Sequence, residues 1–600
     1  MTSLAACLRP GDAASAERLL GAMLVAQQAA ATRESAVEGA FAAAAAVVPL
    51  LAGGDRSALG TSPCGRWLVA IDARLTNRQT LAATLGVTST SGRELVLGAF
   101  TRWGSEAPSR LSGNFAIIAW DRDAHRLHLI RDPLGQRPLF FRAVAGGYAA
   151  ASMPAGLAAP FGDPLRPDPG RLCRLLNHRM ELDDASHYAG ILRVRPGEIV
   201  TLAGDAPPRA RLYWRPDTDP DSRLTTRDCA DAFAGLLPIA VADQVDRGRA
   251  VGAHLSAGLD SSAVTALAAR ATDARILAIT AAPADGAPIT APRGRLVDES
   301  PLARLVTAGG RVDHHCIAGG DGFASLLDNA HAALAQPMPS PQNYGWVAAS
   351  FDLLRAHDIA VVLIGQAGNF TFSRDGQPGL RELLRAGRWG GVLRRLLDPA
   401  QIGARLAQVQ QRLASRGSEA DRAARWTLAR TIIDDPATPL APPEHSLAIL
   451  QGMDPGALLR SFFTRWGIDM RDPTADQRLV ELALRIPTSA LRSGSLDRAP
   501  ARLSLGGIVP DAVRLNRRRG YQSSDWLDRM TRERSLIAQE VAALGRSAVA
   551  QDIIDVPRLR RLVEDWPTDM RYTPDVERVY RHVVPQAITI AGWARRVAGE

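Results

Sequence analysis

The sequence contains no lysine, so each of its 71 basic residues is an arginine. Any mechanism that needs a lysine side chain is therefore excluded. The 62 acidic residues leave a formal net charge of +9, which favours anionic partners in general. Arginine without lysine, beside abundant alanine, is typical of genome composition, and no motif for binding RNA or DNA accompanies the charge. The charge alone identifies no partner.

Cysteine and long apolar segments are also scarce. The five cysteines form no Cys-x-x-Cys pair, and an odd, scattered set argues against a disulfide framework or a zinc finger. The best apolar run, 40–52, contains Pro49 and is too short to span a bilayer. The first residues lack a basic segment followed by an apolar one, as in a secretion signal. These absences predict a cytoplasmic protein without a membrane span.

The 600 residues do contain enough apolar sequence, 46% of the chain, for large folded cores. Up to about residue 205, short alternating runs separated by glycine and proline predict a sheet-rich α+β domain. Its main predicted strands are 65–76, 114–121, 125–132 and 138–144. Residues 206–226, dense in proline, aspartate and arginine, are predicted to be a linker.

From residue 227 to the end, short apolar strands alternate with helical stretches, which predicts a parallel sheet covered by helices. The predicted strands are 250–255, 276–280, 312–317 and 359–365. Helical periodicity dominates from about residue 380. It includes an arginine-rich helix at 381–398, which we interpret as a solvated face or a docking site for an acidic partner. The sequence thus predicts two domains, 1–205 and 227–600.

The strongest local signal is HLSAGLDSSAV, residues 254–264, where a strand runs through a short loop into a helix. Gly258 is expected to let the backbone turn tightly, so that N–H groups and three hydroxyls face an anion at the helix N-terminus. Asp260 is well placed to hold Mg²⁺ against phosphates. The predicted nucleotide-binding residues of this loop are Ser256, Gly258, Leu259, Asp260, Ser261 and Ser262. An ordinary helix N-cap is the alternative.

This loop resembles the pyrophosphatase loop of the ATP pyrophosphatases, and the chain as a whole resembles the asparagine synthetases. The motifs that carry the resemblance occur in order at 69–81, 110–141, 188–200, 213–214, 254–264, 296–303, 361–369, 467–487 and 506–522. The resemblance implies an Ntn-hydrolase-like domain at 1–205, similar to class II glutamine amidotransferases. At 227–600 it implies an α/β adenine-nucleotide-hydrolase-like domain with a helical C-terminal part, and it implies ATP and Mg²⁺ as cofactors.

Glutamine-dependent members of that family begin Met-Cys, and their cysteine attacks the glutamine amide. This sequence begins Met1-Thr2-Ser3, and the Arg-Gly-Pro-Asp stretch that binds glutamine has no match. A threonine or serine nucleophile, exposed after loss of Met1, is an alternative. We expect a vestigial amidotransferase domain without glutaminase activity, so that the amine comes from the substrate itself.

The segment 361–376 departs from the asparagine synthetases in a second way. Where they carry Gly-Glu-Gly-Ala-Asp-Glu, this chain has Gly365, Gln366, Gly368 and Asn369. The resemblance implies that Gly365 lies at the nucleotide and that Asn369 is an uncharged metal contact. Gln366 stands where the β-lactam synthetases place a catalytic tyrosine. This pattern, with Ser373 downstream, resembles the lasso peptide cyclases.

Two further residues carry the predicted chemistry. Asp469 stands where the β-lactam synthetases have a glutamate, and it is expected to orient the base or to act as general base itself. Pairing of Asp469 with Arg471 or Arg478 is the alternative. Arg518 aligns with the family's lysine and is expected to neutralise charge on the α-phosphate. Tyr521 and a substrate-assisted route are also compatible with the role of base.

Three weaker signals lie in the same domain. The acidic pair 298–299 either supports the nucleotide or places acids in the first turn of a helix. Asn343 and Tyr344 either read a peptide backbone or belong to a rigid connector. The histidine pair 314–315 is expected inside the core.

These features together predict a lasso peptide cyclase, which is an AMP-forming carbon–nitrogen ligase. As the resemblance implies, an Asp or Glu side chain of a ribosomally made core peptide is adenylated, and the N-terminal amine of that peptide then closes a macrolactam. The expected partners are the precursor peptide, a leader-binding protein and a leader protease, with neither nucleic acid nor membrane. The alternatives are another amide synthetase of the superfamily, making asparagine or a β-lactam, and a non-catalytic scaffold that binds peptides.

Overall fold

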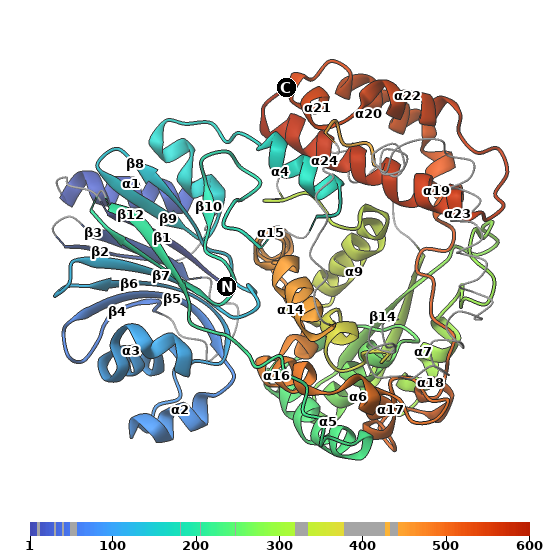
Figure 1. Ribbon diagram of the computed structural model, residues 1–600, viewed down its shortest axis with the longest axis horizontal. Helices are drawn as coiled ribbons and strands as arrows, with labels where there is room; N and C mark the ends of the chain where they lie inside the picture. Colours follow the sequence, from blue (N-terminus) through green and yellow to red (C-terminus); the bar gives the residue numbers. More distant parts are fainter. Residues whose placement is uncertain are drawn as a thin grey trace.

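The computed structural model describes all residues except 9–12, 29–31, 39–40, 48–56, 180–181, 205, 247, 319–333, 377–426 and 432–441. Two bodies lie side by side in Figure 1: a body of stacked sheets, blue to cyan, and a larger body of helices around a sheet, green to red. The arginine-rich helix predicted at 381–398 lies outside the described residues.

The N-terminal body is built from two six-stranded antiparallel sheets. In sheet order, the first consists of β10 (Leu192–Arg193), β8 (Phe140–Val144), β9 (Gly147–Ala151), β1 (Thr2–Leu8), β3 (Phe41–Val47) and β2 (Thr32–Glu38). The second consists of β12 (Ala206–Leu212), β11 (Glu198–Ala203), β7 (Arg126–Arg131), β6 (Gly113–Asp121), β5 (Trp67–Leu75) and β4 (Leu59–Thr61). The four strands predicted in this region all form.

Side-chain alternation along β5 explains the layering. Leu68 and Ala70 face the core between the two sheets, whereas Val69 and Ile71 face a second core beneath α3 (Gly92–Trp103). The short helix α2 (Arg78–Leu85) lies beside α3 (Figure 1). On the opposite side of the two sheets, α1 (Ala13–Ala26) packs on β1 and β3. The order helix, sheet, sheet, helix confirms the predicted Ntn-hydrolase-like fold class.

The second body is organised around a five-stranded parallel sheet. In sheet order its strands are β15 (Val312–Ala318), β14 (Ile276–Ala282), β13 (Val251–His254), β16 (Val361–Leu363) and β17 (Asp469–Arg471). One face is covered by α5 (Thr226–Ala242), α6 (Leu259–Ala271) and α7 (Ser300–Thr307), the other by α9 (Tyr344–Ala356) and α15 (Gly456–Trp466). This arrangement is the predicted α/β domain.

Helices complete the C-terminal part. They are α14 (Pro442–Met453), α16 (Gln477–Arg485), α17 (Ala499–Ser504), α18 (Asp511–Arg514), α19 (Trp526–Arg532), α20 (Arg534–Leu544), α21 (Ala548–Ile553), α22 (Val556–Glu564), α23 (Pro574–Val576) and α24 (Val584–Val597), with a π-helical turn, η9 (Glu577–Val583), before α24. Trp593 of α24 packs edge-on against Tyr188, beside α4 (Pro169–Leu176), so the chain's last helix docks on the first body. In the part of the chain that the structure describes, no helix has both the length and the apolarity to cross a membrane.

The linker predicted at 206–226 is wrong in its first part, because Ala206–Leu212 form the edge strand β12 paired with β11. Most side chains of β12 are exposed, so no apolar alternation marks it, and its two prolines are tolerated at an edge. The connection ends at Thr225, which forms a capping box with Asp228 at the start of α5.

The histidine pair predicted inside the core is only half-buried, because β15 is an edge strand. His314 shares a 2.7 Å hydrogen bond between Nε2 and Thr280 Oγ1 on the neighbouring strand. The pair is a feature of the sheet edge.

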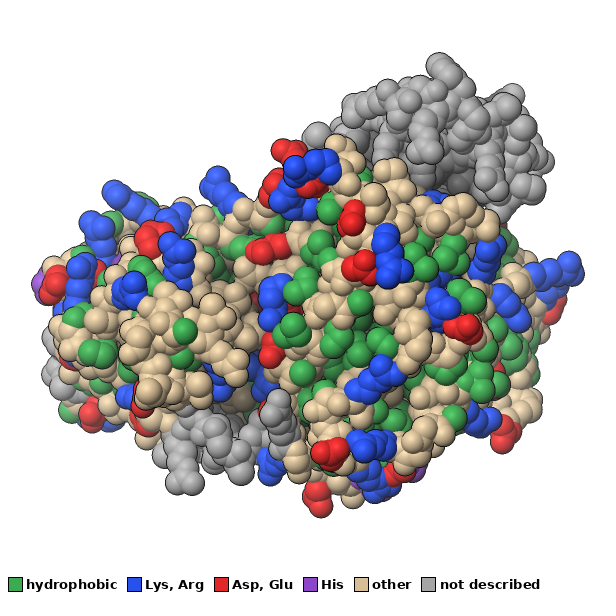
Figure 2. Space-filling view, turned by 90° about the horizontal axis from the view of Figure 1, so that it is seen from below, with side chains coloured by type: hydrophobic (Ala, Val, Ile, Leu, Met, Phe, Trp, Pro, Cys, Tyr) green, Lys and Arg blue, Asp and Glu red, His purple; other side chains and the backbone are tan. Residues whose placement is uncertain are grey.

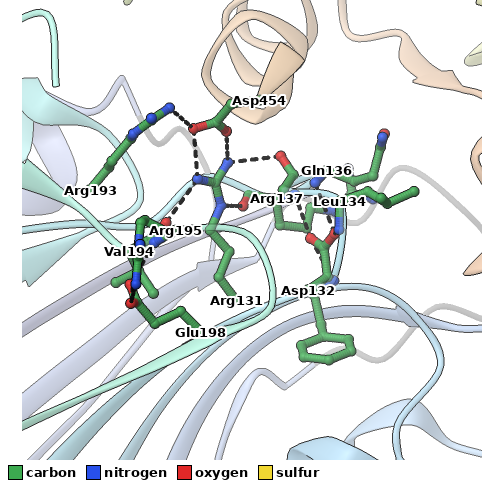
Figure 3. Close-up of polar contacts among 12 residues, drawn as sticks. Arg131, Asp132, Leu134, Gln136, Arg137, Arg193, Val194, Arg195, Glu198 and Asp454 are labelled. Atoms are coloured by element: carbon green, nitrogen blue, oxygen red, sulfur yellow. Dashed lines mark hydrogen bonds and ion pairs between the residues drawn. The ribbon is translucent and has the colours of Figure 1, made fainter. Parts of the chain in front are cut away.

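Buried ion pairs join the two bodies (Figure 3). Asp454 accepts hydrogen bonds from Arg131 Nη1 (3.1 Å) and Arg193 Nη1 (2.6 Å), across the boundary between the bodies. Burial alone raises the pKa of Asp454, but the two guanidinium groups more than offset this and lower it.

Every blue side chain on the face in Figure 2 is an arginine, and acidic side chains lie among them, so no single basic patch dominates that face.

Candidate active site

A cavity of about 820 Å³ lies at the carboxyl ends of the parallel strands. Its walls include the loop after β13, the segment after β16 and Met470 of β17. In parallel α/β sheets, the carboxyl edge of the strands is the usual place for a ligand. The sequence motifs that follow β13 and β16 therefore meet in one site.

The loop after β13 folds onto its own serines. Ser256 Oγ and Ser261 Oγ share a 2.8 Å hydrogen bond, and the Gly258 N–H donates to Ser256 Oγ (3.1 Å). Ser262 is fully buried, and its hydroxyl donates to the Ser256 carbonyl (3.2 Å). Ser256 and Ser261 line the cavity and Ser262 does not, so the prediction of three hydroxyls facing a ligand is wrong by one.

Gly258 does not serve the loop in the way the sequence predicts. Its backbone is extended (φ −78°), a conformation open to any residue, and not the tight turn expected of a glycine. A Cβ at this position lies 3.1 Å from Ser256 Oγ. The glycine therefore provides space beside the serine hydroxyls.

Asp260 has an unbalanced environment. Its Oδ2 accepts a 2.8 Å hydrogen bond from Ser373 Oγ, whereas its buried Oδ1 has no hydrogen-bond partner. Burial raises the pKa of Asp260 to about 6. Gly368 packs so closely that a Cβ there clashes with the Asp260 carboxylate, and Gly365 packs against the Asp260 backbone. The two glycines hold the segment after β16 against this carboxylate.

Arg498 belongs to the site although no sequence pattern predicts it. It lines the cavity, and its Nη2 donates to Asn369 Oδ1 (3.2 Å). Its backbone is left-handed (φ 52°), which is uncommon for a non-glycine residue and tends to occur at functional sites. Asn369, predicted as a metal contact, thus directs its oxygen to a guanidinium in this structure.

The two acids of the pair 298–299 have different roles: one lies at the start of a helix, and the other contacts the serine loop. Asp298 Oδ1 accepts from the Ser300 N–H (2.8 Å) at the start of α7. Glu299 lines the cavity and its Oε1 accepts from the Ala257 N–H of the loop (3.0 Å). Burial raises the pKa of Glu299.

Most of the other predicted residues also reach the cavity. Gln366 is exposed on its wall, and Arg518 is exposed there with its Nη2 donating to the Arg295 carbonyl (2.9 Å). The predicted residues that line the cavity are Ser256, Gly258, Leu259, Asp260, Ser261, Gly365, Gln366, Asn369, Arg518 and Tyr521. Among the residues predicted to bind the nucleotide or metal or to act in catalysis, Ser262 and Asp469 do not line it.

The structure does not bring Asp469, predicted to be the base or to orient it, to the cavity. Asp469 lies on β17, next to Met470, and only Met470 lines the cavity because neighbouring strand side chains point to opposite faces. Asp469 is buried, accepts from Arg471 Nε (2.8 Å) and lies 3.5 Å from Arg137 Nη1 of the first body. Burial opposes ionisation, but Arg137 and Arg471 hold the pKa of Asp469 well below its usual range. Pairing with Arg471, the alternative reading, is confirmed.

One wall of the cavity is apolar. Its side chains are Met338, Trp346, Val347, Leu458, Leu459, Phe462 and Met470. Two buried polar atoms on this wall, Trp346 Nε1 and Asn343 Oδ1, have no hydrogen-bond partner. Tyr344, predicted beside Asn343 as a contact for peptide, is instead in the core, where its hydroxyl accepts from Arg465 Nη1 (3.1 Å).

Known proteins resemble both halves of the chain. A family model described as asparagine synthase matches residues 232–593, and one described as glutamine amidotransferase domain matches residues 51–214. A Bacillus subtilis phosphoribosylpyrophosphate amidotransferase, solved with ADP and GMP, has a TM-score of 0.28 at 12% identity, covering 54% of this chain and 82% of that one.

Curated relatives match over shorter stretches. A Mycobacterium bovis protein provisionally named as a glutamine-hydrolyzing asparagine synthetase is 30% identical over 195 residues, which are 30% of this chain and 28% of that protein. Asparagine synthetase 1 of Bacillus subtilis is 25% identical over 181 residues, which are 30% of this chain and 28% of that protein. Amidase chyE of Penicillium rubens is 24% identical over 305 residues, which are 49% of this chain and 45% of that protein. The chain thus spans less than half the length of these relatives, but the asparagine synthase model covers more than half of the chain. The protein belongs to the asparagine synthase family.

Proposed function

We propose that this protein is an ATP-dependent, amide-forming ligase, and specifically a lasso peptide cyclase. It adenylates an acidic side chain of a leaderless core peptide, joins that carbonyl to the N-terminal amine of the same peptide, and releases AMP and pyrophosphate. The observation that carries the proposal is the single cavity in which the serine loop faces an extensive apolar wall.

The apolar wall favours a peptide over free aspartate. Aspartate is small and charged at every end, so Trp346, Phe462 and Met338 offer it nothing. A peptide presents side chains that gain from apolar burial, about 25 cal/mol per Å². It also presents carbonyl and N–H groups that can pair with Trp346 Nε1 and Asn343 Oδ1, whose burial without partners is costly.

The residues present fit ATP and Mg²⁺. The free Oδ1 of Asp260 is a hard oxygen ligand in a buried site, and Ser256, Ser261 and the N-terminus of α6 suit phosphate oxygens. Among the described residues no group of three or more His, Cys, Asp or Glu side chains forms a metal cage. This suits Mg²⁺, which typically binds through one or two carboxylates plus phosphates, and which supplies charge neutralisation there.

The chain's own cations support the same chemistry. Arg498 lies next to Asn369 near the loop, and Arg518 is held at the cavity rim by the Arg295 carbonyl. Guanidinium groups placed around a phosphate stabilise the negative charge that develops on transfer. The cavity holds the two ends of one substrate chain together, an effect that contributes roughly 7–11 kcal/mol in well-oriented cases.

A substrate amine, and not ammonia from glutamine, is supported by the boundary between the bodies. The side chains of Arg137, Asp469 and Arg471 are buried there, next to the Met470 that lines the cavity. These ion-paired side chains lie where Arg137 of the first body meets β17, the strand that carries Met470. We therefore propose that the amidotransferase-like domain lacks glutaminase activity and that the cyclase works in the cytoplasm with a leader-binding protein and a leader protease.

The family assignment supports one second candidate, asparagine synthesis, because the matching Bacillus subtilis protein bears that name. The two are separated by giving the purified protein Mg²⁺ and ATP with a synthetic acidic core peptide, or with aspartate plus glutamine or ammonia. AMP together with a peptide lighter by one water supports the cyclase. AMP with asparagine supports the alternative, and no AMP with either, in the presence of the partner proteins, supports a non-catalytic scaffold.

A further inference from the structure

A second polar cluster lines the cavity, centred on Glu577. Tyr521 Oη donates a 2.6 Å hydrogen bond to Glu577 Oε1, and Tyr572 Oη donates a 2.8 Å hydrogen bond to Oε2. Tyr521 and Glu577 line the cavity and Tyr572 does not. Two phenols thus bind one carboxylate, and only one of them faces the place where a substrate binds.

The backbone around Glu577 is unusual. Glu577–Val583 form the π-helical turn η9, and single π turns are rare and frequently lie at functional sites. Arg581, four residues on, lies over the Tyr521 ring at 3.8 Å from its centroid. Its Nη1 lies 3.7 Å from Glu577 Oε1, and its Nη2 donates to the Gln522 carbonyl (2.6 Å). The ring is held between this guanidinium and the carboxylate.

Two neighbouring residues, Gly520 and Tyr521, connect the cluster to the nucleotide loop. The Tyr521 N–H donates to the Leu296 carbonyl (2.8 Å), and Gly520 packs directly on the Glu299 carboxylate. Glu299 in turn accepts from the Ala257 N–H of the loop (3.0 Å). The phenol of Tyr521 therefore has a defined position relative to the loop.

The other acids that line the cavity have different neighbours. Asp260 accepts from Ser373, Glu299 accepts from the Ala257 N–H of the loop, and Asp497 lies 3.2 Å from Arg502 Nη2. Burial raises the pKa of Glu577, but hydrogen bonds from Tyr521 and Tyr572 and the Arg581 charge outweigh it, so the carboxylate stays ionised. Burial raises the pKa of Tyr521, so its phenol keeps its proton at rest. A protonated phenol that donates a 2.6 Å hydrogen bond to an ionised carboxylate forms a path along which one proton can move.

We propose that Tyr521 and Glu577 accept the proton that the attacking amine loses during ring closure, an inference that rests on the proposed function. As the amine nitrogen bonds to the acyl carbon, the bond from that carbon to the AMP oxygen breaks, and AMP leaves with the electron pair. The amine proton moves to Tyr521 Oη while the phenol proton moves to Glu577 Oε1. Tyr521 is regenerated, and Glu577 ends protonated.

Two partial reactions test the relay. ATP–pyrophosphate exchange reports adenylation, and mass spectrometry of the product reports ring closure, on a panel of synthetic linear peptides that each carry a free N-terminus and one Asp or Glu. We expect Tyr521→Phe and Glu577→Gln to keep exchange near the wild-type rate and to slow ring closure at least about 100-fold, the usual contribution of general base catalysis. Tyr148→Phe, which removes a hydroxyl that donates to the Ala206 carbonyl in the first body, is the matched control and keeps both reactions.

Hydroxylamine separates a lost proton acceptor from a damaged site. This small nucleophile traps the acyl-adenylate as a hydroxamate, so the two variants are expected to form hydroxamate as fast as the wild type. Wild-type ring closure in Tyr521→Phe or Glu577→Gln overturns the relay alone, as does equal loss of exchange, closure and trapping. A wild-type protein that adenylates none of the peptides overturns the proposed function, and the relay with it.

Discussion

Buried aspartates in two regions of the molecule have opposite environments. At the boundary between the bodies, Asp454 and Asp469 each contact two arginines, and their pKa values are lowered. In the cavity, Asp260 has one hydrogen bond from Ser373, a free Oδ1 and a raised pKa. The interface aspartates are paired within the fold, whereas Asp260 keeps one oxygen free for a ligand. Pairing with arginine, and not burial, separates the two environments.

The largest expected effect follows from removing the cavity charge. Asp260→Asn is expected to abolish magnesium-dependent ATP binding and to lower ATP–pyrophosphate exchange at least about 100-fold, because the negative charge that would hold the metal is lost. Isothermal titration calorimetry and exchange assays measure this. Asp497→Asn, an acid of the same cavity paired with Arg502, is the control and should bind ATP normally. Equal losses in both variants contradict the assignment.

The interface should respond in stability rather than activity. Asp454→Asn leaves Arg131 and Arg193 buried without their counter-ion, and we expect about 3–5 kcal/mol of lost unfolding free energy in denaturant titrations. Glu106→Gln breaks an exposed pair with Arg211 and is expected to cost no more than about 1 kcal/mol. If Asp454→Asn also costs less than about 1 kcal/mol, the buried ion pairs are not what stabilises the boundary between the bodies.

The two regions also differ in pH dependence. The pKa of Asp260 is about 6 in the folded protein against a usual value of 3.8, so the folded state holds the proton between these values. Stability contributed by this group therefore falls as pH rises from about 4 to about 6, by up to about 3 kcal/mol. The lowered pKa values of Asp454 and Asp469 act in the other direction, because their contribution is lost as pH falls through the acidic range.

Denaturant titrations between pH 5 and pH 7.5 check this prediction. Without ligand, Asp260→Asn should be more stable than the wild type at pH 7.5, and the difference should shrink toward pH 5. Adding Mg²⁺ with ATP should raise the unfolding free energy of the wild type at pH 7.5 and leave that of the variant unchanged. A variant that is less stable at both pH values shows that Asp260 is already satisfied in the fold.

A smaller effect is expected at Arg498. Arg498→Gln removes a charge near Asn369 and the loop but leaves Asp260 in place, so we expect about a tenfold weaker ATP affinity, equivalent to about 1.4 kcal/mol. Calorimetry measures it. Arg517→Gln, another exposed arginine of the cavity wall, is the control, and equal weakening there reduces the effect to general charge.

The smallest effect is expected at Gly258. Because its φ of −78° suits any residue, Gly258→Ala should change the unfolding free energy by no more than about 0.5 kcal/mol. Its Cβ would lie 3.1 Å from Ser256 Oγ, so ATP affinity is expected to fall slightly. A large loss of stability would show that the loop needs a glycine backbone.

The fold and the loop were predictable because their signals are local. The strand, glycine, acid and serines at 254–262 occur within one short stretch, and β5 and β6 are largely apolar runs bounded by turn residues. Three-residue β17 is too short to show alternation, so nothing revealed that Asp469 faces Arg137, far away in the sequence. Helix periodicity, by contrast, could have shown that Ser262 turns inward.

The missed site residues depend on contacts between distant segments. Glu577 and Arg581 are four apart in a charged stretch, which is typical of a solvated helix, and only the π turn and Tyr521 bring them to the cavity. Arg498 is marked by its backbone angle, which no sequence pattern encodes. Strand β12 has the sequence pattern of a linker because an exposed edge needs no apolar alternation.

The most direct test of the central claim follows the oxygen of the substrate carboxylate. A core peptide labelled with heavy oxygen in its Asp or Glu side chain is incubated with the protein, Mg²⁺ and ATP, and AMP is analysed by mass spectrometry. Adenylation at the Asp260 site predicts one labelled oxygen in AMP for each ring closed, and none in Asp260→Asn. Label in inorganic phosphate, or ring closure without labelled AMP, would contradict the account.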